Sequence, residues 1–220
     1  FKPSYGDSTV CVHAKFFGKD CSIIGNNGPI DTNGATKAAQ FIQLSDQVNK
    51  PIIFLNNTTG FLVGKKYEHQ GMIKHGSKLI QAVTNARVAK ISFYIGASFG
   101  AGNYGMCGYA FKPDFLFTWP NAKTGVMGGK QAAITMEHVW NRASERRGEK
   151  LEAKKQKIKL QKIEEHFESQ SDAFYTSGRM MDHGMIDPRE TRNIIGFCLG
   201  VCQNKEKRQL NPNSFGVARL

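Results

Sequence analysis

Short apolar runs alternate, over the first half of the chain, with longer stretches whose apolar residues recur at helical spacing. The short runs are rich in β-branched and aromatic residues and are bounded by turn-forming residues, a pattern typical of buried strands. We therefore expect strands at residues 9–17, 21–24, 51–55, 91–95 and 115–118. The first two flank Gly18-Lys19-Asp20, which predicts a hairpin turn.

The longer stretches predict helices that pack on a sheet. Residues 36–48 carry apolar side chains on one face and end before Pro51, and residues 67–86 do the same with a core stripe. That stripe consists of Met72, Ile73, Leu79, Ile80 and Val83. Strand–helix alternation of this kind predicts an α/β fold with right-handed crossovers and with both faces of the sheet covered.

The last third of the chain has a different pattern. Residues 131–167 predict long helices that break near Arg147-Gly148. Asp187, followed by Pro188, has the sequence of an N-cap with proline at the first helical position, and it predicts a last helix to about Cys202. We expect one domain over residues 1–220, with a ββα core at 1–130 and a mostly helical extension at 131–220.

The stretch from Ile91 to Gly108 is the first candidate for chemistry. After the apolar strand, five glycines (Gly96, Gly100, Gly102, Gly105 and Gly108) follow within thirteen residues. A strand that enters a glycine-rich turn and opens a short helix leaves backbone N–H groups facing one point, which suits a phosphate or a transient oxyanion. A tight turn with close backbone packing explains the same glycines.

Composition and charge are compatible with several classes of binding partner and do not choose among them. The chain has 220 residues, 40% of them hydrophobic, and a formal net charge of +12, as in a basic globular protein. Nucleic acid, acidic small molecules such as CoA esters and an acidic partner chain all suit this charge. The lysines and arginines are spread along the chain, and the densest part, residues 142–162, also contains glutamates. No apolar run is long enough to cross a bilayer, so we expect no membrane partner.

The five cysteines are odd in number and stand mostly in apolar surroundings, which predicts buried free thiols in a reducing compartment. Cys198 and Cys202, four residues apart on a predicted helix, have no CxxC or paired-histidine motif to support a metal site. We expect no metal. The sequence begins with Phe1 rather than methionine, so a longer parent chain is an open expectation.

Other motifs can be set aside. Residues 124–131 approach a phosphate-binding P-loop but have Thr124 and Gln131 at two required positions. His69 and His75 are six apart and so lie on different helical faces, which predicts surface residues rather than a metal pair. No Gly-x-Ser-x-Gly elbow occurs. Chemistry in this chain would therefore depend on backbone donors.

Several separated segments are similar to one family. They are Gly25-Asn-Asn-Gly28, residues 54–64, Tyr67-Glu68 with Gly71, residues 96–108, Trp119-Pro-Asn-Ala122, Val126-Met-Gly-Gly129, Met185-Ile-Asp-Pro188 with Thr191-Arg192, and Phe215-Gly-Val-Ala-Arg219. Over nearly its whole length the chain resembles the C-terminal domain of the carboxyltransferase (β) subunit of biotin-dependent acyl-CoA carboxylases, in the methylcrotonyl-CoA and geranyl-CoA branch. The resemblance implies a crotonase-like ββα-spiral fold.

The resemblance also implies a mechanism without a side-chain nucleophile. Carboxybiotin on a carrier domain releases CO2, the biotin ureido anion takes a proton from the acyl-CoA, and the enolate captures CO2. The ureido oxygen is expected to meet the N–H groups of Ala101 and Gly102. The biotin and substrate pocket is expected to include Gly60, Phe61, Gly100, Tyr104, Met127, Gly128 and Gly129. Tyr104 in Gly-Asn-Tyr-Gly is typical of the methylcrotonyl branch, and an aromatic wall there suits a branched acyl group.

The implied partners are a biotin carboxylase and biotin carrier (α) subunit, the family's N-terminal domain, which this chain lacks, and further copies in a homo-oligomer. Nucleic acid is not an expected partner. The resemblance also implies an intracellular protein, of the bacterial cytoplasm or the mitochondrial matrix. Two positions depart from the family, with Lys130 in place of a common Glu and Tyr109 in place of a common Arg. Other crotonase-fold acyl-CoA decarboxylases or hydratases, and a non-catalytic scaffold or basic binding module, remain alternatives.

Overall fold

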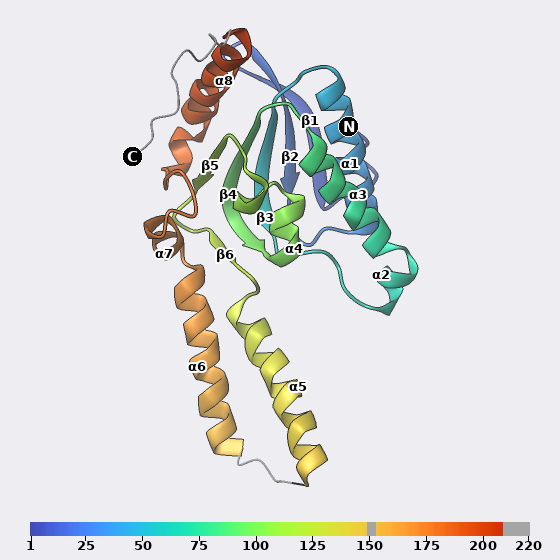
Figure 1. Ribbon diagram of the computed structural model, residues 1–220, viewed down its shortest axis with the longest axis vertical. Coiled ribbons are helices and arrows are strands. Elements are labelled where there is room, and N and C mark those ends of the chain that lie inside the picture. The colour runs from blue at the N-terminus through green and yellow to red at the C-terminus, as the bar shows by residue number, and fades with distance from the viewer. Residues whose placement is uncertain (149–152, 209–220) are drawn as a thin grey trace, which may run out of the picture.

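One mixed sheet organises the computed structural model, which describes residues 1–148 and 153–208 (Figure 1). Within these residues six strands pair in the order β1-β2-β3-β4-β5, and β6 joins the end of β4. The strands are β1 (Thr9–Phe16), β2 (Lys19–Asn26), β3 (Ile52–Thr58), β4 (Lys90–Phe99), β5 (Phe115–Thr118) and β6 (Lys123–Gly125). The family-like segment Phe215-Gly-Val-Ala-Arg219 lies outside the described residues.

The pairing agrees with the predicted hairpin and parallel sheet. β1 and β2 are antiparallel, and β2, β3, β4 and β5 are parallel. The hairpin turn consists of Phe17 and Gly18, with φ of +50° and +79°, as a type I′ turn requires. Lys19 and Asp20, which the sequence predicted as turn residues, are the first residues of β2.

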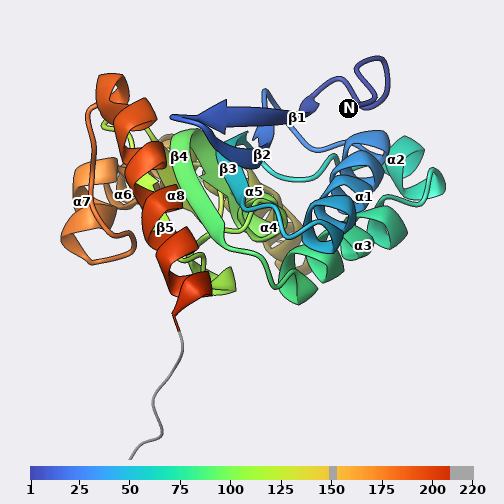
Figure 2. The same ribbon diagram turned by 90° about the horizontal axis from the view of Figure 1, so that it is seen from above.

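Helices cover both faces of the sheet, as predicted (Figure 2). In the first half of the chain the helices are α1 (Thr32–Gln47), α2 (Lys65–His69), α3 (Met72–Asn85) and α4 (Gly100–Gly105), and a 3-10 turn follows at Tyr109–Phe111. α1 and α3 bury one face, around Phe41, Phe54 and Leu79. The last helix, α8 (Thr191–Lys207), buries the other face against Phe93. The crossover geometry of parallel strands requires this two-sided cover.

Two element predictions need correction. The single helix expected at residues 67–86 is two helices, because Gly71 adopts a left-handed φ of +80° between α2 and α3. Ile73 was predicted in the core stripe but is 76% exposed, and Gly76 and Ala82 are buried instead. Because α3 starts anew after Gly71, the helical periodicity counted across Gly71 does not identify the residues of α3 that face the sheet.

Two strands extend beyond the ends that the sequence predicted. β2 continues past residue 24 through Gly25 and Asn26, and β3 continues past residue 55 through the polar residues 56–58. Asn56 and Thr58 are nevertheless buried, with 0% and 1% exposure. Polar side chains therefore stand at the carboxyl edge of the sheet, beside α4.

Two long helices form an arm that stands away from the sheet (Figure 1). They are α5 (Gly129–Arg147) and α6 (Ala153–Ser171), and the short α7 (Ala173–Gly178) follows. α5 starts at Gly129, two residues before the predicted position, and ends at Gly148 in the left-handed conformation, at the predicted break.

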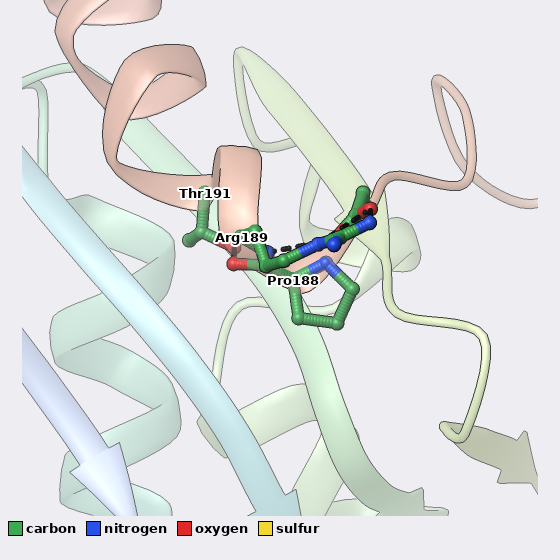
Figure 3. A network of polar contacts seen from close by, with 4 residues as sticks. Pro188, Arg189 and Thr191 are labelled. Carbon is green, nitrogen blue, oxygen red and sulfur yellow. Dashed lines mark hydrogen bonds and ion pairs between the residues drawn. The ribbon is translucent and has the colours of Figure 1, made fainter.

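The cap predicted at Asp187 forms at a 3-10 turn before α8, while α8 itself starts at Thr191 without a side-chain cap (Figure 3). Asp187 Oδ1 accepts a hydrogen bond from Arg189 N–H at 2.9 Å, and Pro188 opens a 3-10 turn, Pro188–Glu190. The Thr191 hydroxyl donates to Pro188 O at 2.7 Å and accepts from Trp119 Nε1 at 3.0 Å. α8 is thereby tied to the loop after β5, and it ends at Lys207 rather than near Cys202.

All five cysteines fall in the described part of the chain, where they are buried free thiols, as predicted. No helix among the described residues is both long and apolar enough to cross a bilayer.

Candidate functional site

A glycine-rich turn follows β4, as the sequence predicted, but it starts four residues later than expected. β4 is ten residues long and runs to Phe99, so α4 starts at Gly100. Gly100 has a left-handed φ of +53°, and an added Cβ would lie 3.0 Å from Val126 O. This position therefore favours glycine on both conformational and steric grounds.

The N–H groups of Ala101 and Gly102 lie in the first turn of α4, where a helix has no internal acceptors. Phe99, the N-cap residue, supplies no side-chain cap. Among the described residues, no backbone or side-chain acceptor takes a hydrogen bond from either amide. Successive amides after a left-handed residue form the kind of concavity that binds anions.

Gly102 brings α4 close to the loop after β3. A Cβ on Gly102 would lie 2.8 Å from Gly60 Cα and 3.1 Å from Thr58 Cγ2, so only glycine fits without moving backbone. Gly60 N–H is already bonded to Thr58 Oγ1 at 3.2 Å. Gly60 thus packs its backbone against α4, and its amide is not a free donor.

A buried polar network holds the turn from below. Asn103 Nδ2 donates to the hydroxyl oxygens of Tyr94 and Ser98, each at 2.9 Å. The Ser98 hydroxyl donates to Asn56 Oδ1 at 3.1 Å, and Tyr109 N–H donates to the Tyr94 hydroxyl at 3.1 Å. The network links α4 to β3 and β4, and satisfied buried networks of this kind are rigid.

Sequence reasoning missed these supporting residues. The available signal was the presence of Tyr94 and Ser98 in an otherwise apolar strand, where buried polar groups need partners. Burial raises the pKa of Tyr94, opposed by the hydrogen bonds from Asn103 and Tyr109. The phenol therefore stays neutral at physiological pH and keeps its hydrogen for donation.

A cleft of about 770 Å³ opens beside α4. It is larger than two other cavities, of about 370 and 320 Å³, that border α1. Four parts of the fold line it: Gly100, Ala101, Asn103 and Tyr104 of α4; Tyr94 with Tyr109 and Ala110; Thr124, Gly125, Val126 and Met127; and Phe167, Gln170, Ser171, Tyr175, Thr176 and Met181. The polar groups that face it are neutral amides and hydroxyls.

The structure brings only some of the expected site residues together. Gly100, Ala101, Tyr104 and Met127 line the cleft. Gly102 is buried and is not part of the cleft lining. The remaining four, Gly60, Phe61, Gly128 and Gly129, stand outside the cleft lining.

Phe61 and Gly129 have clear packing contacts instead. The Phe61 ring lies 3.0 Å from the position of a Cβ on Gly105 and 3.4 Å from that of one on Gly76, so it packs between α4 and α3. Gly129 is buried against α6, where an added Cβ would lie 2.6 Å from Glu164 O.

Within the described ranges, no group of three or more His, Cys, Asp and Glu side chains comes together as a metal site would require. His75 lies within hydrogen-bond distance of the Thr36 hydroxyl, at 2.9 Å, and connects α3 to α1. His69 is exposed, as predicted.

Comparison with known proteins gives consistent matches. The family model for the carboxyl transferase domain matches residues 1–217. The chain is 42% identical over 220 residues to the mitochondrial methylcrotonoyl-CoA carboxylase beta chain of Arabidopsis thaliana, covering 100% of this chain and 37% of that protein. It is 44% identical over 221 residues to the probable biotin-dependent acyl-coenzyme A carboxylase beta2 subunit of Mycobacterium tuberculosis, covering 100% and 41%.

The fold matches a solved structure equally well. The geranyl-CoA carboxylase beta subunit of P. aeruginosa is 48% identical, with a TM-score of 0.92 over 100% of this chain and 41% of that one. This likeness confirms the crotonase-like α/β fold predicted from the sequence. The chain spans about two fifths of the length of the relatives it matches. With a family model that covers residues 1–217, the chain belongs to the carboxyl transferase domain family, as its sequence motifs predicted.

Proposed function

We propose that this chain is the C-terminal domain of a carboxyltransferase subunit and that it provides the biotin half of the site at which a carboxyl group passes to an acyl-CoA. Family membership supports the reaction class, and the names of two relatives support biotin and an acyl-CoA as reactants. The observation that carries the proposal is the pair of unbonded amides at the start of α4, those of Ala101, which lines the cleft, and of its buried neighbour Gly102.

The cleft fits a biotin ring in size and chemistry. Its volume of about 770 Å³ suits a small-molecule site. Tyr104, Met127 and Phe167 offer apolar surface to a hydrocarbon ring. The amides of α4 offer donors for the polar oxygen of the ring. In its carboxylated form, bound biotin would supply the carboxyl group that is transferred.

The chain contributes fixed dipoles to the reaction. The N–H groups of Ala101 and Gly102 donate to the oxygen on which negative charge develops, and the backbone of α4 fixes them before the reaction begins. Preorganised donors stabilise charge without reorganising, and one such donor is typically worth ~10²–10³ in kcat. The Asn103 network keeps both donors in place because it joins α4 to two strands.

Tyr104 supports a branched or long unsaturated acyl group as substrate. Its ring is 46% exposed at the cleft and packs on Phe111, with ring centroids 5.4 Å apart. The two rings form an apolar wall. The relatives that match over all of this chain include methylcrotonoyl-CoA and geranyl-CoA carboxylase beta chains. We therefore propose 3-methylcrotonyl-CoA as the first substrate to test.

The other half of the site is assigned to partners. In this proposal an N-terminal carboxyltransferase domain binds the thioester oxygen, and a biotin carboxylase and carrier subunit delivers biotin. The arm supports contact with further protein, because Ile134, Val139 and Ile158 are at least half exposed on it, at 55%, 51% and 50%.

The test is co-expression of this chain with the coding segment upstream of it and with a biotin-bearing subunit. Carboxyl transfer is then measured with 3-methylcrotonyl-, geranyl- and propionyl-CoA. The proposal expects turnover with the branched substrates. A well-folded complex that binds biotin but carboxylates none of the three would favour the scaffold alternative.

A further inference from the structure

The side chain of Glu168, on α6, contacts two points of another segment. One oxygen forms an ion pair with Lys123 Nζ, and the side chain packs against Gly129, where an added Cβ would lie 3.0 Å from Glu168 Cγ. Lys123 is the first residue of β6, and Gly129 is the first residue of α5. A single side chain therefore joins α6 to both ends of the segment 124–128.

That segment is one wall of the cleft. Thr124, Gly125, Val126 and Met127 line it, and Val126 O approaches Gly100 of the glycine turn. The facing wall includes Phe167, Gln170 and Ser171, which stand beside Glu168 on α6. The contacts of Glu168 thus determine how far apart the two walls stand.

Electrostatics at the start of α5 explain why an acidic residue is needed there. α5 has no acidic residue in its first turn and no side-chain cap at Gly128, and Lys130 adds a positive charge to the positive end of the helix dipole. The carboxylate of Glu168 supplies the missing negative charge. The hydrogen bond from Lys123, with the Gly129 amide and the charge of Lys130, holds the pKa of Glu168 below its ordinary value despite partial burial.

We infer that Glu168 is a positioning residue that fixes the wall 124–128 against the glycine turn and so sets the width of the cleft for its ligand. The identity of that ligand, biotin, rests on the proposed function. Glu168 does not line the cleft itself and acts through Lys123 and Gly129.

The test uses the complete carboxylase that contains this chain. Glu168→Gln keeps the size of the side chain and removes its charge, and Lys123→Met breaks only one of the two contacts. Glu165→Gln is the matched control, because Glu165 is exposed on the same helix and, among the described residues, accepts a hydrogen bond from Gln161 of that helix. The double variant Lys130→Glu with Glu168→Gln returns a negative charge to the start of α5.

Two readouts separate this inference from the proposed function. Hydrogen exchange over residues 123–130 should rise about tenfold or more in Glu168→Gln, the loss expected for a hydrogen bond to a charged group, and should recover in the double variant. The KM for biotin should rise by a similar factor with kcat less affected, and Glu165→Gln should match the wild type in both. Unchanged exchange in Glu168→Gln, or increased exchange with an unchanged KM, would overturn the inference.

If the wild type transfers no carboxyl group, the proposed function fails, and hydrogen exchange alone then tests the role of Glu168.

Discussion

Asn103 Nδ2 lies 2.9 Å from the hydroxyl oxygen of Tyr94 and donates a hydrogen bond to it beneath the glycine turn. The same amide group also donates to Ser98. One side chain of α4 is therefore bonded to two residues of β4, and this contact fixes the orientation of the helix whose first amides face the cleft.

Replacing Asn103 by Ala should therefore destabilise the domain and lower its activity. The change removes the donor to the buried Ser98 hydroxyl and one of the two donors to the Tyr94 hydroxyl, at a cost of about 1–3 kcal/mol in the free energy of unfolding. Urea unfolding and steady-state kinetics would measure the two effects. Tyr94→Phe removes the shared acceptor and should give a loss of similar size. Wild-type stability in both variants would show that the network does not hold the turn.

Gly108→Ala should be strongly destabilising for a purely steric reason. Gly108 has an ordinary φ of −68°, but an added Cβ would lie 1.8 Å from Asn103 Oδ1. The new methyl group must displace the Asn103 side chain and with it the network. The double variant with Asn103→Ala should be no less stable than Asn103→Ala alone, since the clashing atoms are gone. Simple additivity of the two losses would contradict this account.

The buried thiols predict a loss of stability at alkaline pH. Burial raises the pKa of Cys11, Cys21 and Cys107 from 9.0 to about 11. The folded state therefore retains these protons to higher pH than the unfolded state does, so their contribution is complete below pH 9 and is lost as the pH rises from 9 toward about 11. Unfolding curves at pH 8 and pH 10.5 would test this expectation.

The same thiols should be unreactive in the folded protein. Only the thiolate reacts, and burial keeps these groups protonated at pH 8. A thiol reagent should label none of the five cysteines quickly without denaturant and all five in urea. Rapid labelling of the folded chain would show that a cysteine is more exposed than the structure indicates.

Tyr104→Asp should shift substrate preference toward short acyl groups. The change removes the apolar ring at the cleft and its contact with Phe111. We expect kcat/KM for 3-methylcrotonyl-CoA to fall relative to propionyl-CoA by ~10–200-fold, the range that one apolar contact typically controls. An unchanged ratio would show that Tyr104 does not contact the acyl group.

Much of the fold could be predicted from local sequence patterns, because the apolar runs and the helix-ending or capping residues Gly148 and Asp187 determine structure within a few residues. The wrong predictions concern elements whose structure depends on tertiary contacts. Gly71 breaks a helix whose periodicity looks continuous, and Ile73 is consequently exposed. β6 was missed because Lys123–Gly125 is three residues long and is a strand only through its pairing with β4.

The candidate site followed from the sequence in part. The glycine spacing and family motifs predicted the unbonded amides at Ala101 and Gly102. The supporting side chains were not predictable, because Asn103 and Tyr94 meet only after α4 folds back on β4. Glu168 is 45 residues from its partner Lys123, a separation that no local pattern can bridge.

The central claim is that main-chain N–H groups of α4 stabilise the charge that develops during carboxyl transfer. Ala101→Pro removes one donor at a first-turn position where proline is tolerated, and Ala101→Gly keeps it at the same position. In the complete carboxylase, we expect Ala101→Pro to lower kcat ~10²–10³-fold and Ala101→Gly to stay near the wild type. Wild-type kcat in a stably folded Ala101→Pro variant would contradict the account.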